Sequence, residues 1–280
     1  MKFSTVLSIQ PTQFDAVVFK GNFNENAATI AGLGYDGLEL AIRDPAQIDL
    51  AAITRTLTRH DLVVPALGTG QAYSEERLSF TDGDGEVRAA AVARIKAHIR
   101  LAAELKAVVI LGLIRGRTPP HIERTQAMAW LVTAMGDCAE AADREDVQLV
   151  IEPINRYETD LINSIEEGLG LLARVGAGSR TLGLLPDTFH MNIEEPSITA
   201  SLRRAAPYIF HFHVADSNRW YPGAGHLDFR NILALLRDEA GYDGWVSAET
   251  LPYPDIGTAA AQGLRHLQAC LAGSKDGGHE

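Results

Sequence analysis

The regular alternation of two kinds of segment constrains this chain of 280 residues more than any other feature. Short apolar runs rich in Val, Ile and Leu are separated by longer stretches in which apolar residues recur with the period of a helix. The expected strands are Phe3–Ile9, Gly37–Ile42, Val63–Leu67, Val108–Leu113, Gln148–Pro153, Thr181–Pro186, Ile209–Ala215 and Trp245–Thr250. The expected helices are Asn24–Leu33, Leu50–Arg59, Gly85–Leu105, Thr125–Ala142, Ile165–Val175, Ile198–Ala205, Phe229–Glu239 and Ile256–Leu271. Since strands that are buried on both faces read as continuous apolar runs, the pattern predicts a parallel sheet covered by helices.

Two folds alternate strands and helices in this way, a closed barrel and an open doubly wound sheet. The open sheet usually carries a glycine-rich phosphate-binding turn after its first strand, but here the first strand is followed by Ile9-Gln10-Pro11-Thr12-Gln13. The strand–helix units also follow one another without a linker or a change of composition. The sequence therefore predicts an α/β fold, a single (β/α)₈ TIM barrel over residues 1–273, with a flexible C-terminal tail over residues 274–280.

Charge and composition limit the partners of the chain. The formal net charge is -11, so a general basic face for nucleic acid or anionic membranes is not expected. No apolar run approaches the roughly 18 residues that a membrane helix needs, and the N-terminus leads directly into a strand candidate without signal-peptide features. Cys138 and Cys270 lie in separate helix candidates, as expected for reduced packing residues. We therefore expect a cytoplasmic protein without nucleic-acid or membrane partners.

Potential metal ligands stand at the ends of the last four expected strands. In a barrel, the C-terminal ends of the strands build the active site. The four residues, each set among apolar neighbours, are Glu152, Asp187, His213 and Glu249. Three converging carboxylates would repel one another, so a cation is expected at their centre, and this oxygen-rich set suits Mn²⁺, Mg²⁺ or Co²⁺. Any one of these residues alone could be a salt-bridge partner or a satisfied buried polar group, but four at successive strand ends favour a metal site.

Further polar residues lie in the loops that follow these strands. Glu158, His190 and Arg219 could hydrogen-bond the hydroxyl and carbonyl oxygens of a polyol, or could serve only loop solvation and loop–loop pairing. His211 lies two residues before His213 and faces the same side of its strand, so we expect it one layer deeper than the ligands. No Ser–His–Asp order, cysteine nucleophile, Walker loop or dinucleotide fingerprint occurs in a suitable context.

Three motifs carry a family resemblance that covers essentially the whole chain. They are Glu152-Pro153-Ile154-Asn155-Arg156-Tyr157-Glu158, Asp187-Thr188-Phe189-His190-Met191-Asn192 and His213-Val214-Ala215-Asp216-Ser217-Asn218-Arg219. They resemble the xylose-isomerase-like barrel family and, within it, the D-tagatose 3-epimerase branch. The resemblance implies that the four strand-end residues bind one divalent ion, with Mn²⁺ favoured, and that Glu152 and Glu249 also exchange the substrate proton. It further implies that Glu158, His190 and Arg219 hold the sugar near its carbonyl, and that the chain forms a homo-oligomer, a dimer or tetramer.

A finer likeness is to the 5-keto-L-gluconate epimerase type. It depends on Phe19-Lys20-Gly21, Gly68-Thr69-Gly70-Gln71-Ala72-Tyr73 and Gly112-Leu113-Ile114-Arg115-Gly116-Arg117. The likeness adds Gln71, Arg115 and Arg117 to the expected substrate contacts. Arg115 and Arg117 follow the fourth strand at the active face, where a guanidinium could pair with a sugar-acid carboxylate in bidentate geometry. The alternative is that both arginines are exposed loop residues.

Together these residues predict proton transfer next to a ketone. A carboxylate alone is too weak a base for this step, so the metal would stabilise the enediolate while one glutamate removes the proton and the other returns one to the opposite face. The sequence predicts a metal-dependent epimerase of a keto-sugar or keto-sugar acid, of the 5-keto-L-gluconate or D-tagaturonate type. A neutral ketose 3-epimerase for tagatose, fructose or psicose and an aldose–ketose isomerase are the alternatives, because the same ligands serve them. An abasic-site endonuclease is more remote, since it would need more histidine ligands and a basic groove, and so is a sugar-binding barrel without catalysis.

Overall fold

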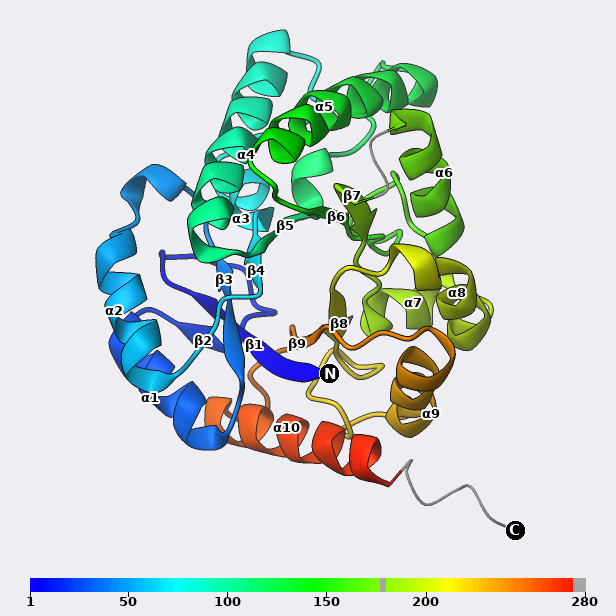
Figure 1. The fold of residues 1–280 in the computed structure, drawn as a ribbon. Coiled ribbons are helices and arrows are strands. Elements are labelled where there is room, and N and C mark those ends of the chain that lie inside the picture. Colours follow the sequence, from blue (N-terminus) through cyan, green and yellow to red (C-terminus); the bar gives the residue numbers. More distant parts are fainter. Residues whose placement is uncertain (177–179, 274–280) are drawn as a thin grey trace.

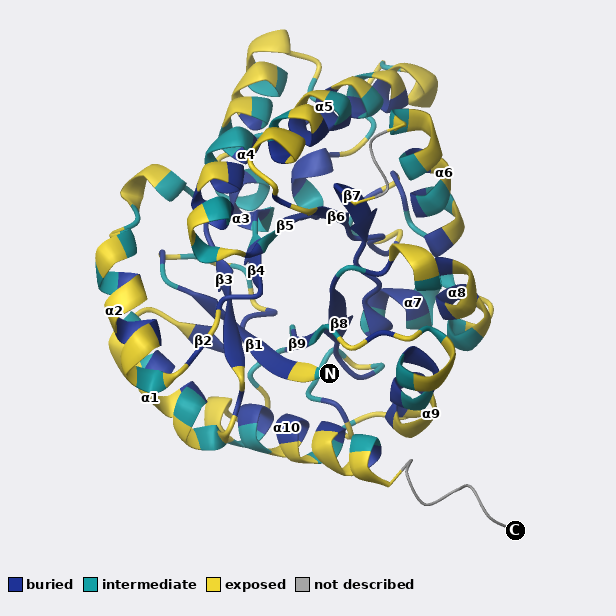
Figure 2. Ribbon diagram, viewed as in Figure 1, coloured by how far each residue is buried: buried dark blue, intermediate teal, exposed yellow. Residues whose placement is uncertain are grey.

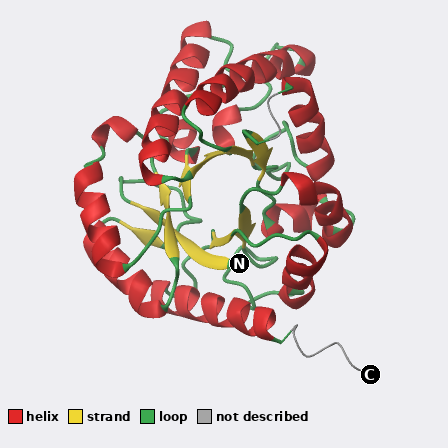
Figure 3. Cartoon of the chain, in the orientation of Figure 1, coloured by secondary structure: helices red, strands yellow, loops and turns green. Residues whose placement is uncertain are grey.

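A ring of parallel strands surrounded by a ring of helices forms the molecule (Figure 1, Figure 3). The structure, a computed structural model, describes residues 1–176 and 180–273. The predicted α/β barrel is confirmed by the parallel pairing of its strands. The expected tail, residues 274–280, lies outside the described residues.

The barrel strands follow one another around the ring. They are β1 (Lys2–Ser8), β3 (Gly37–Ala41), β4 (Ala66–Gly68), β5 (Val108–Leu111), β6 (Leu149–Ile151), β7 (Leu182–Leu184), β8 (Phe212–Val214) and β9 (Trp245–Ala248). Hydrogen bonds run from β7 through β6, β5, β4, β3, β1 and β9 to β8. Two isolated parallel bridges, Leu184 with Ile209 and Asp187 with His213, join the segments of β7 and β8 and close the ring.

The helices lie outside the strands and largely match their predicted ranges. They are α1 (Phe23–Leu33), α2 (Leu50–His60), α4 (Gly85–Leu105), α5 (Arg124–Arg144), α6 (Ile165–Val175), α8 (Ile198–Ala205), α9 (Phe229–Ala234) and α10 (Ile256–Ala272). Side-chain caps explain several starts: the Ser164 hydroxyl accepts a hydrogen bond from the amide of Glu167, and the Asp84 carboxylate accepts one from Glu86. The expected helix Phe229–Glu239 differs, because its second half is a π-helical turn over Leu235–Glu239.

Two predicted strands, Val63–Leu67 and Ile209–Ala215, begin three residues too early, and several short elements were missed. Strand β4 begins at Ala66 rather than Val63, because Pro65 has no N–H to donate to the ladder, although Val63 still bridges to Gly37. Strand β8 begins at Phe212, although Ile209 still bridges to Leu184. The missed elements are β2 (Phe19–Lys20), α3 (Gly70–Ser74), α7 (Thr188–Glu194) and 3₁₀ turns at Pro45–Gln47, Leu113–Arg115 and Ala206–Tyr208. The elements β2, α3 and α7 all belong to connections that leave a strand at its C-terminal end.

Apolar side chains fill the space between the strands and the helices. Figure 2 shows strands that are mostly buried and outer helices that alternate between buried and exposed faces. A smaller apolar cluster inside the barrel consists of Ala66, Ile110, Val150 and Leu185. The barrel is therefore a packed core whose remaining polar interior groups need a specific explanation.

Within the described residues, no helix combines the length and the apolar character needed to cross a membrane.

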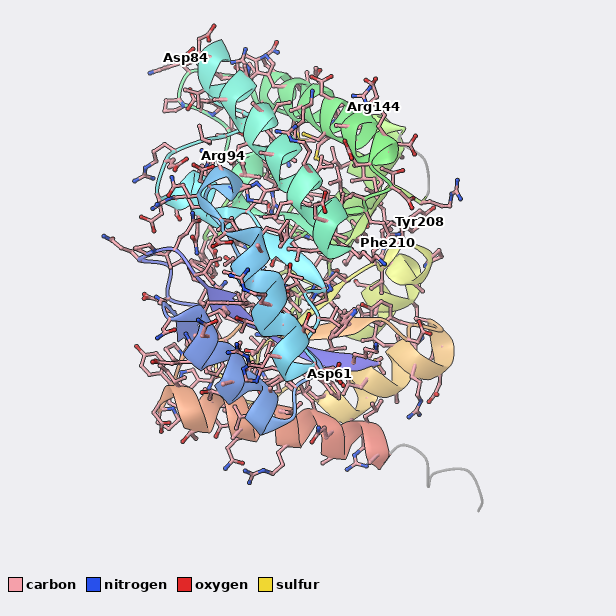
Figure 4. All side chains as sticks on the ribbon, turned by 60° about the vertical axis from the view of Figure 1, so that its left-hand side comes forward. Asp61, Asp84, Arg94, Arg144, Tyr208 and Phe210 are labelled. Carbon is pink, nitrogen blue, oxygen red and sulfur yellow. The ribbon has the colours of Figure 1, made fainter. Side chains whose placement is uncertain are left out.

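The helices run back against the strands, which brings the loops after the strands to one end of the barrel. In Figure 4, Asp84 marks the start of α4 at one side, whereas Asp61 and Arg144 mark the ends of α2 and α5 further across the molecule. Tyr208 and Phe210, which precede β8, also lie on that far side. The residues that follow the strands therefore collect at the opposite end, where barrel active sites are built.

Candidate metal centre and active site

One buried cluster brings together the four residues expected at the strand ends, Glu152, Asp187, His213 and Glu249. One possible ligand atom from each lies within 4.8 Å of those of the others. His213 Nδ1 is 3.7 Å from Glu152 Oε1 and 3.8 Å from Asp187 Oδ2. His213 lies in β8, while the three carboxylates follow β6, β7 and β9 directly or within a few residues. The closed ring therefore turns positions that are distant in sequence into neighbours.

Local backbone features orient two of the carboxylates. Asp187 caps helix α7, because its Oδ1 accepts hydrogen bonds from the amides of Phe189 at 2.7 Å and His190 at 3.4 Å. Its second oxygen, Oδ2, is left to face the cluster. Glu152 lies against Gly112, where an added Cβ would stand 2.8 Å from Glu152 Oε2. A side chain at this position, just after β5, would displace the Glu152 carboxylate from where it lies.

The donor set fits a divalent cation. Glu152 Oε1 and His213 Nδ1 are buried and have no hydrogen-bond partner, although such atoms are normally paired. Burial raises the pKa of Asp187 and of Glu249, and the negative charge of Glu152 raises both further. The cluster thus brings together carboxylates that disfavour one another's negative charge, and two unpartnered atoms that face one another. A bound cation would satisfy both.

Glu39, which the sequence analysis missed, binds the far side of His213. Its carboxylate lies 3.0 and 3.2 Å from His213 Nε2 and 2.8 Å from His211 Nε2. Burial alone would raise the pKa of Glu39, but the positive charge of His213 and the hydrogen bonds from both imidazoles hold this pKa well below its usual range. The same carboxylate raises the pKa of His213 far above its ordinary value, against the effect of burial. The sequence signal that could have revealed this contact is the position of Glu39 in the middle of an otherwise apolar strand, where a charged side chain needs a buried partner.

Arg219 links two carboxylates at the cluster. Its Nη1 donates to Glu158 Oε1 at 2.8 Å and its Nη2 donates to Glu249 Oε2 at 3.3 Å. The guanidinium carbon lies 4.9 Å from the centre of the Phe189 ring, within the range of a cation–π contact. The guanidinium of Arg219 therefore places positive charge beside Glu249, and these contacts fix its orientation.

His190 is held in one tautomer by Asn155. The side-chain amide of Asn155 lies 2.8 Å from His190 Nδ1, and its main-chain N–H donates to the same nitrogen at 3.4 Å. Burial and the positive charge of Arg219 hold the pKa of His190 well below its usual value, so the ring is neutral. Because Nδ1 accepts, the proton is on Nε2, which lies 3.7 Å from Glu152 Oε1. The sequence predicted no role for Asn155. Its role in fixing the His190 tautomer depends on this contact.

A cavity at the C-terminal end of the barrel is lined by most of the expected site residues. They are Gln71, Glu152, Glu158, His190, His213, Arg219 and Glu249, together with apolar residues such as Val6, Phe14, Ile110, Leu113 and Ile154. Gln71 Nε2 donates to Ser8 Oγ at 2.7 Å, while its Oε1 is buried without a partner. The exposed Arg117 lines a different cavity, beside Arg77 and Asp160.

Arg115 is not placed as the finer likeness implies. Its side chain is completely buried, and its guanidinium donates to the main-chain carbonyls of Gly112, Glu152, Leu161 and Ile162. Burial lowers its pKa to about 10. With its hydrogen bonds directed to the backbone and no exposed surface, Arg115 holds the loops together instead of contacting a substrate carboxylate. The expected role of this arginine is thereby corrected.

Comparisons with known proteins agree with the barrel fold. Residues 27–270 match the family described as xylose isomerase-like TIM barrel. The chain is 32% identical to the L-ribulose 3-epimerase of Methylomonas sp., over 84% of this chain and 82% of that protein. It is 29% identical to the D-psicose 3-epimerase of Agrobacterium fabrum, over 82% of this chain and 80% of that protein. The crystal structure of the D-allulose 3-epimerase from Methylomonas sp. in complex with D-allulose superimposes with a TM-score of 0.81 at 26% identity, covering 96% of each chain. The chain therefore belongs to the xylose isomerase-like TIM barrel family, and within it to the sugar epimerases of the ketose 3-epimerase branch.

Proposed function

We propose that this protein inverts C3 of neutral ketoses, as the names of its relatives, D-psicose 3-epimerase and L-ribulose 3-epimerase, suggest. The observation that carries the proposal is the presence of two glutamates, Glu152 and Glu249, in one buried four-residue cluster. Inversion needs an acid–base group on each face of the carbon, and two carboxylates beside one substrate site supply this pair.

Most of the polar residues that line the cavity have a role in this reaction. Glu152 takes the proton from C3 on one face, and Glu249 returns a proton on the other. When bound by the four-residue cluster, a divalent ion, with Mn²⁺ favoured over Mg²⁺ or Co²⁺, would balance the carboxylates and stabilise negative charge on the substrate oxygens. His190 donates from Nε2, and Arg219 with Glu158 orients the hydroxyl groups next to the carbonyl. The unpartnered Oε1 of Gln71 is available to a hydroxyl farther along the sugar.

The charges around the cavity favour a neutral ketose over a keto-sugar acid. Among the described residues that line it, Arg219 is the only Arg or Lys, and it is already paired with Glu158 and Glu249. Arg115 is directed to the backbone, and Arg117 lines another cavity. A substrate carboxylate would thus meet several glutamates without an unpaired arginine or lysine to bind it, which is costly in a poorly solvated site. The 5-keto-L-gluconate or D-tagaturonate activity is therefore the weaker candidate.

Solvent-deuterium incorporation tests the proposal. The purified protein with Mn²⁺ in D₂O is incubated with D-fructose, L-ribulose, 5-keto-L-gluconate or D-tagaturonate, and NMR locates the exchanged carbon while chromatography identifies the product. We expect exchange at C3, formation of the 3-epimer, and higher kcat/KM for the neutral ketoses. A higher kcat/KM for an acid would establish the other substrate class, and exchange at C1 with an aldose product would establish isomerisation. A folded, Mn²⁺-loaded protein that exchanges no substrate proton would refute the epimerase function.

The expected dimer or tetramer stays a prediction, which analytical ultracentrifugation can test.

A further inference from the structure

Glu39 makes a contact that no step of the proposed reaction uses. It lies in β3, whereas His213 lies in β8 and His211 just before that strand. On the shorter way around the ring, two other strands, β1 and β9, separate β3 from β8 (Figure 1). The carboxylate therefore reaches across the barrel interior. Glu39, His211 and His213 each have only about 1% of their surface exposed. A charged group held in this position without water needs its hydrogen bonds to be satisfied, and the two imidazoles do so.

The contact determines which nitrogen of His213 is free. Both oxygens of Glu39 are within hydrogen-bond distance of Nε2, at 3.0 and 3.2 Å. A carboxylate only accepts, so the imidazole proton is on Nε2. In the neutral ring this leaves the lone pair on Nδ1, the buried and unpartnered nitrogen that faces Glu152 and Asp187 at 3.7 and 3.8 Å. A metal-binding histidine commonly has this arrangement, with a carboxylate on its other nitrogen.

His211 completes the arrangement by holding the carboxylate itself. Its Nε2 is 2.8 Å from Glu39 Oε2, and its ring meets that of His213 edge-on, with 5.4 Å between the ring centres. Glu39 is thereby held between two rings and cannot turn away from His213.

From this geometry we infer that Glu39 is a positioning residue, which fixes the tautomer and the direction of His213 so that Nδ1 binds the divalent ion. The inference rests on the metal centre of the proposed function. Its physical basis is that an imidazole whose proton and orientation are set in advance loses less entropy, and needs no tautomer change, when the ion binds.

A rival interpretation is a second cation held by Glu39, His211 and His213, whose possible ligand atoms also lie within 4.8 Å of one another. Such an ion would need the lone pair of His213 Nε2 while the first ion uses that of Nδ1. The imidazole would then have to lose its remaining proton. Hydrogen bonds of 2.8–3.2 Å account for the same geometry without that loss.

Metal titration of the metal-free protein tests the inference without relying on turnover. Calorimetry with Mn²⁺ gives the Kd and the stoichiometry for the wild type and for Glu39→Leu, which keeps similar bulk but removes the acceptor. The visible spectrum of bound Co²⁺ reports whether the imidazole nitrogen remains a ligand. We expect one ion per wild-type chain and a Kd about 10–100-fold higher in Glu39→Leu, the usual effect of removing such a partner. Thr56→Val is the control, because it also removes the hydrogen bond of a buried side chain, in α2 on the outside of the barrel, and should leave the Kd unchanged.

The outcomes separate this inference from the proposed function. A folded Glu39→Leu with the wild-type Kd and Co²⁺ spectrum would overturn the inference alone. Two ions in the wild type and one in the variant would establish the rival second site and overturn the positioning role. A wild type that binds no divalent ion would remove the metal centre, and with it the proposed function as well. If Glu39→Leu fails to fold, Glu39→Met, which also lacks a carboxylate or carbonyl acceptor, decides the question, and a wild-type Kd in that variant would also overturn the inference.

Discussion

Replacing Arg115 with Met tests whether this arginine stabilises the fold by holding loops together. Its guanidinium donates to the carbonyls of Leu161 and Ile162 in the loop after β6, and to those of Gly112 and Glu152 beside the cluster. A hydrogen bond from a charged group contributes about 1.5–3 kcal/mol, but the substitution also removes a charge that is costly to bury. From these opposing effects we expect Arg115→Met to lower the free energy of unfolding by about 3 kcal/mol. This is a large part of the roughly 5–15 kcal/mol that stabilises a typical domain.

Urea-induced unfolding of the metal-free protein, followed by circular dichroism, measures this difference. Arg117→Met is the matched control, because Arg117 is two residues away but exposed, and its loss should change the free energy of unfolding by less than about 0.5 kcal/mol. Equal unfolding midpoints for Arg115→Met and the wild type would refute the structural role. If Arg115→Met also kept its stability and lost only the turnover of keto-sugar acids, the original interpretation as a carboxylate ligand would be restored.

Three further predictions concern the reaction. Glu152→Gln and Glu249→Gln should each reduce kcat by about 10²–10⁴-fold, because each loses a proton-transfer group; near-normal kcat in a variant that retains its metal would remove that residue from the role. Chelation should abolish activity, and Mn²⁺ or Co²⁺ should restore it better than Ca²⁺, whose larger and looser shell suits this set poorly; full turnover by a demonstrably metal-free protein would exclude the mechanism. Arg219→Met should reduce kcat/KM by a similar factor for neutral ketoses and for keto-sugar acids, because the arginine is tied to Glu158 and Glu249. A loss confined to the acids would instead identify Arg219 as a carboxylate ligand.

The sequence alone determined most of the architecture and the composition of the cluster. Continuous apolar runs and helical periodicity are local properties, so the eight strand–helix units could be identified without tertiary information. Barrel geometry then brings the ends of parallel strands together at one edge. For this reason Glu152, Asp187, His213 and Glu249 could be grouped in advance, although the first and the last are 97 positions apart.

Only the tertiary structure decided which side chains meet across the barrel and which way the loop residues point. Glu39 and His213 are 174 positions apart, and no spacing rule connects strands that are not neighbours in the ring. Arg115 and Arg117 are two residues apart in one loop, yet the 3₁₀ turn at Leu113–Arg115 directs the first into the protein while the second is exposed. The difference arises because periodicity encodes the face of a regular element, whereas the direction of a loop residue depends on packing against segments that are distant in sequence.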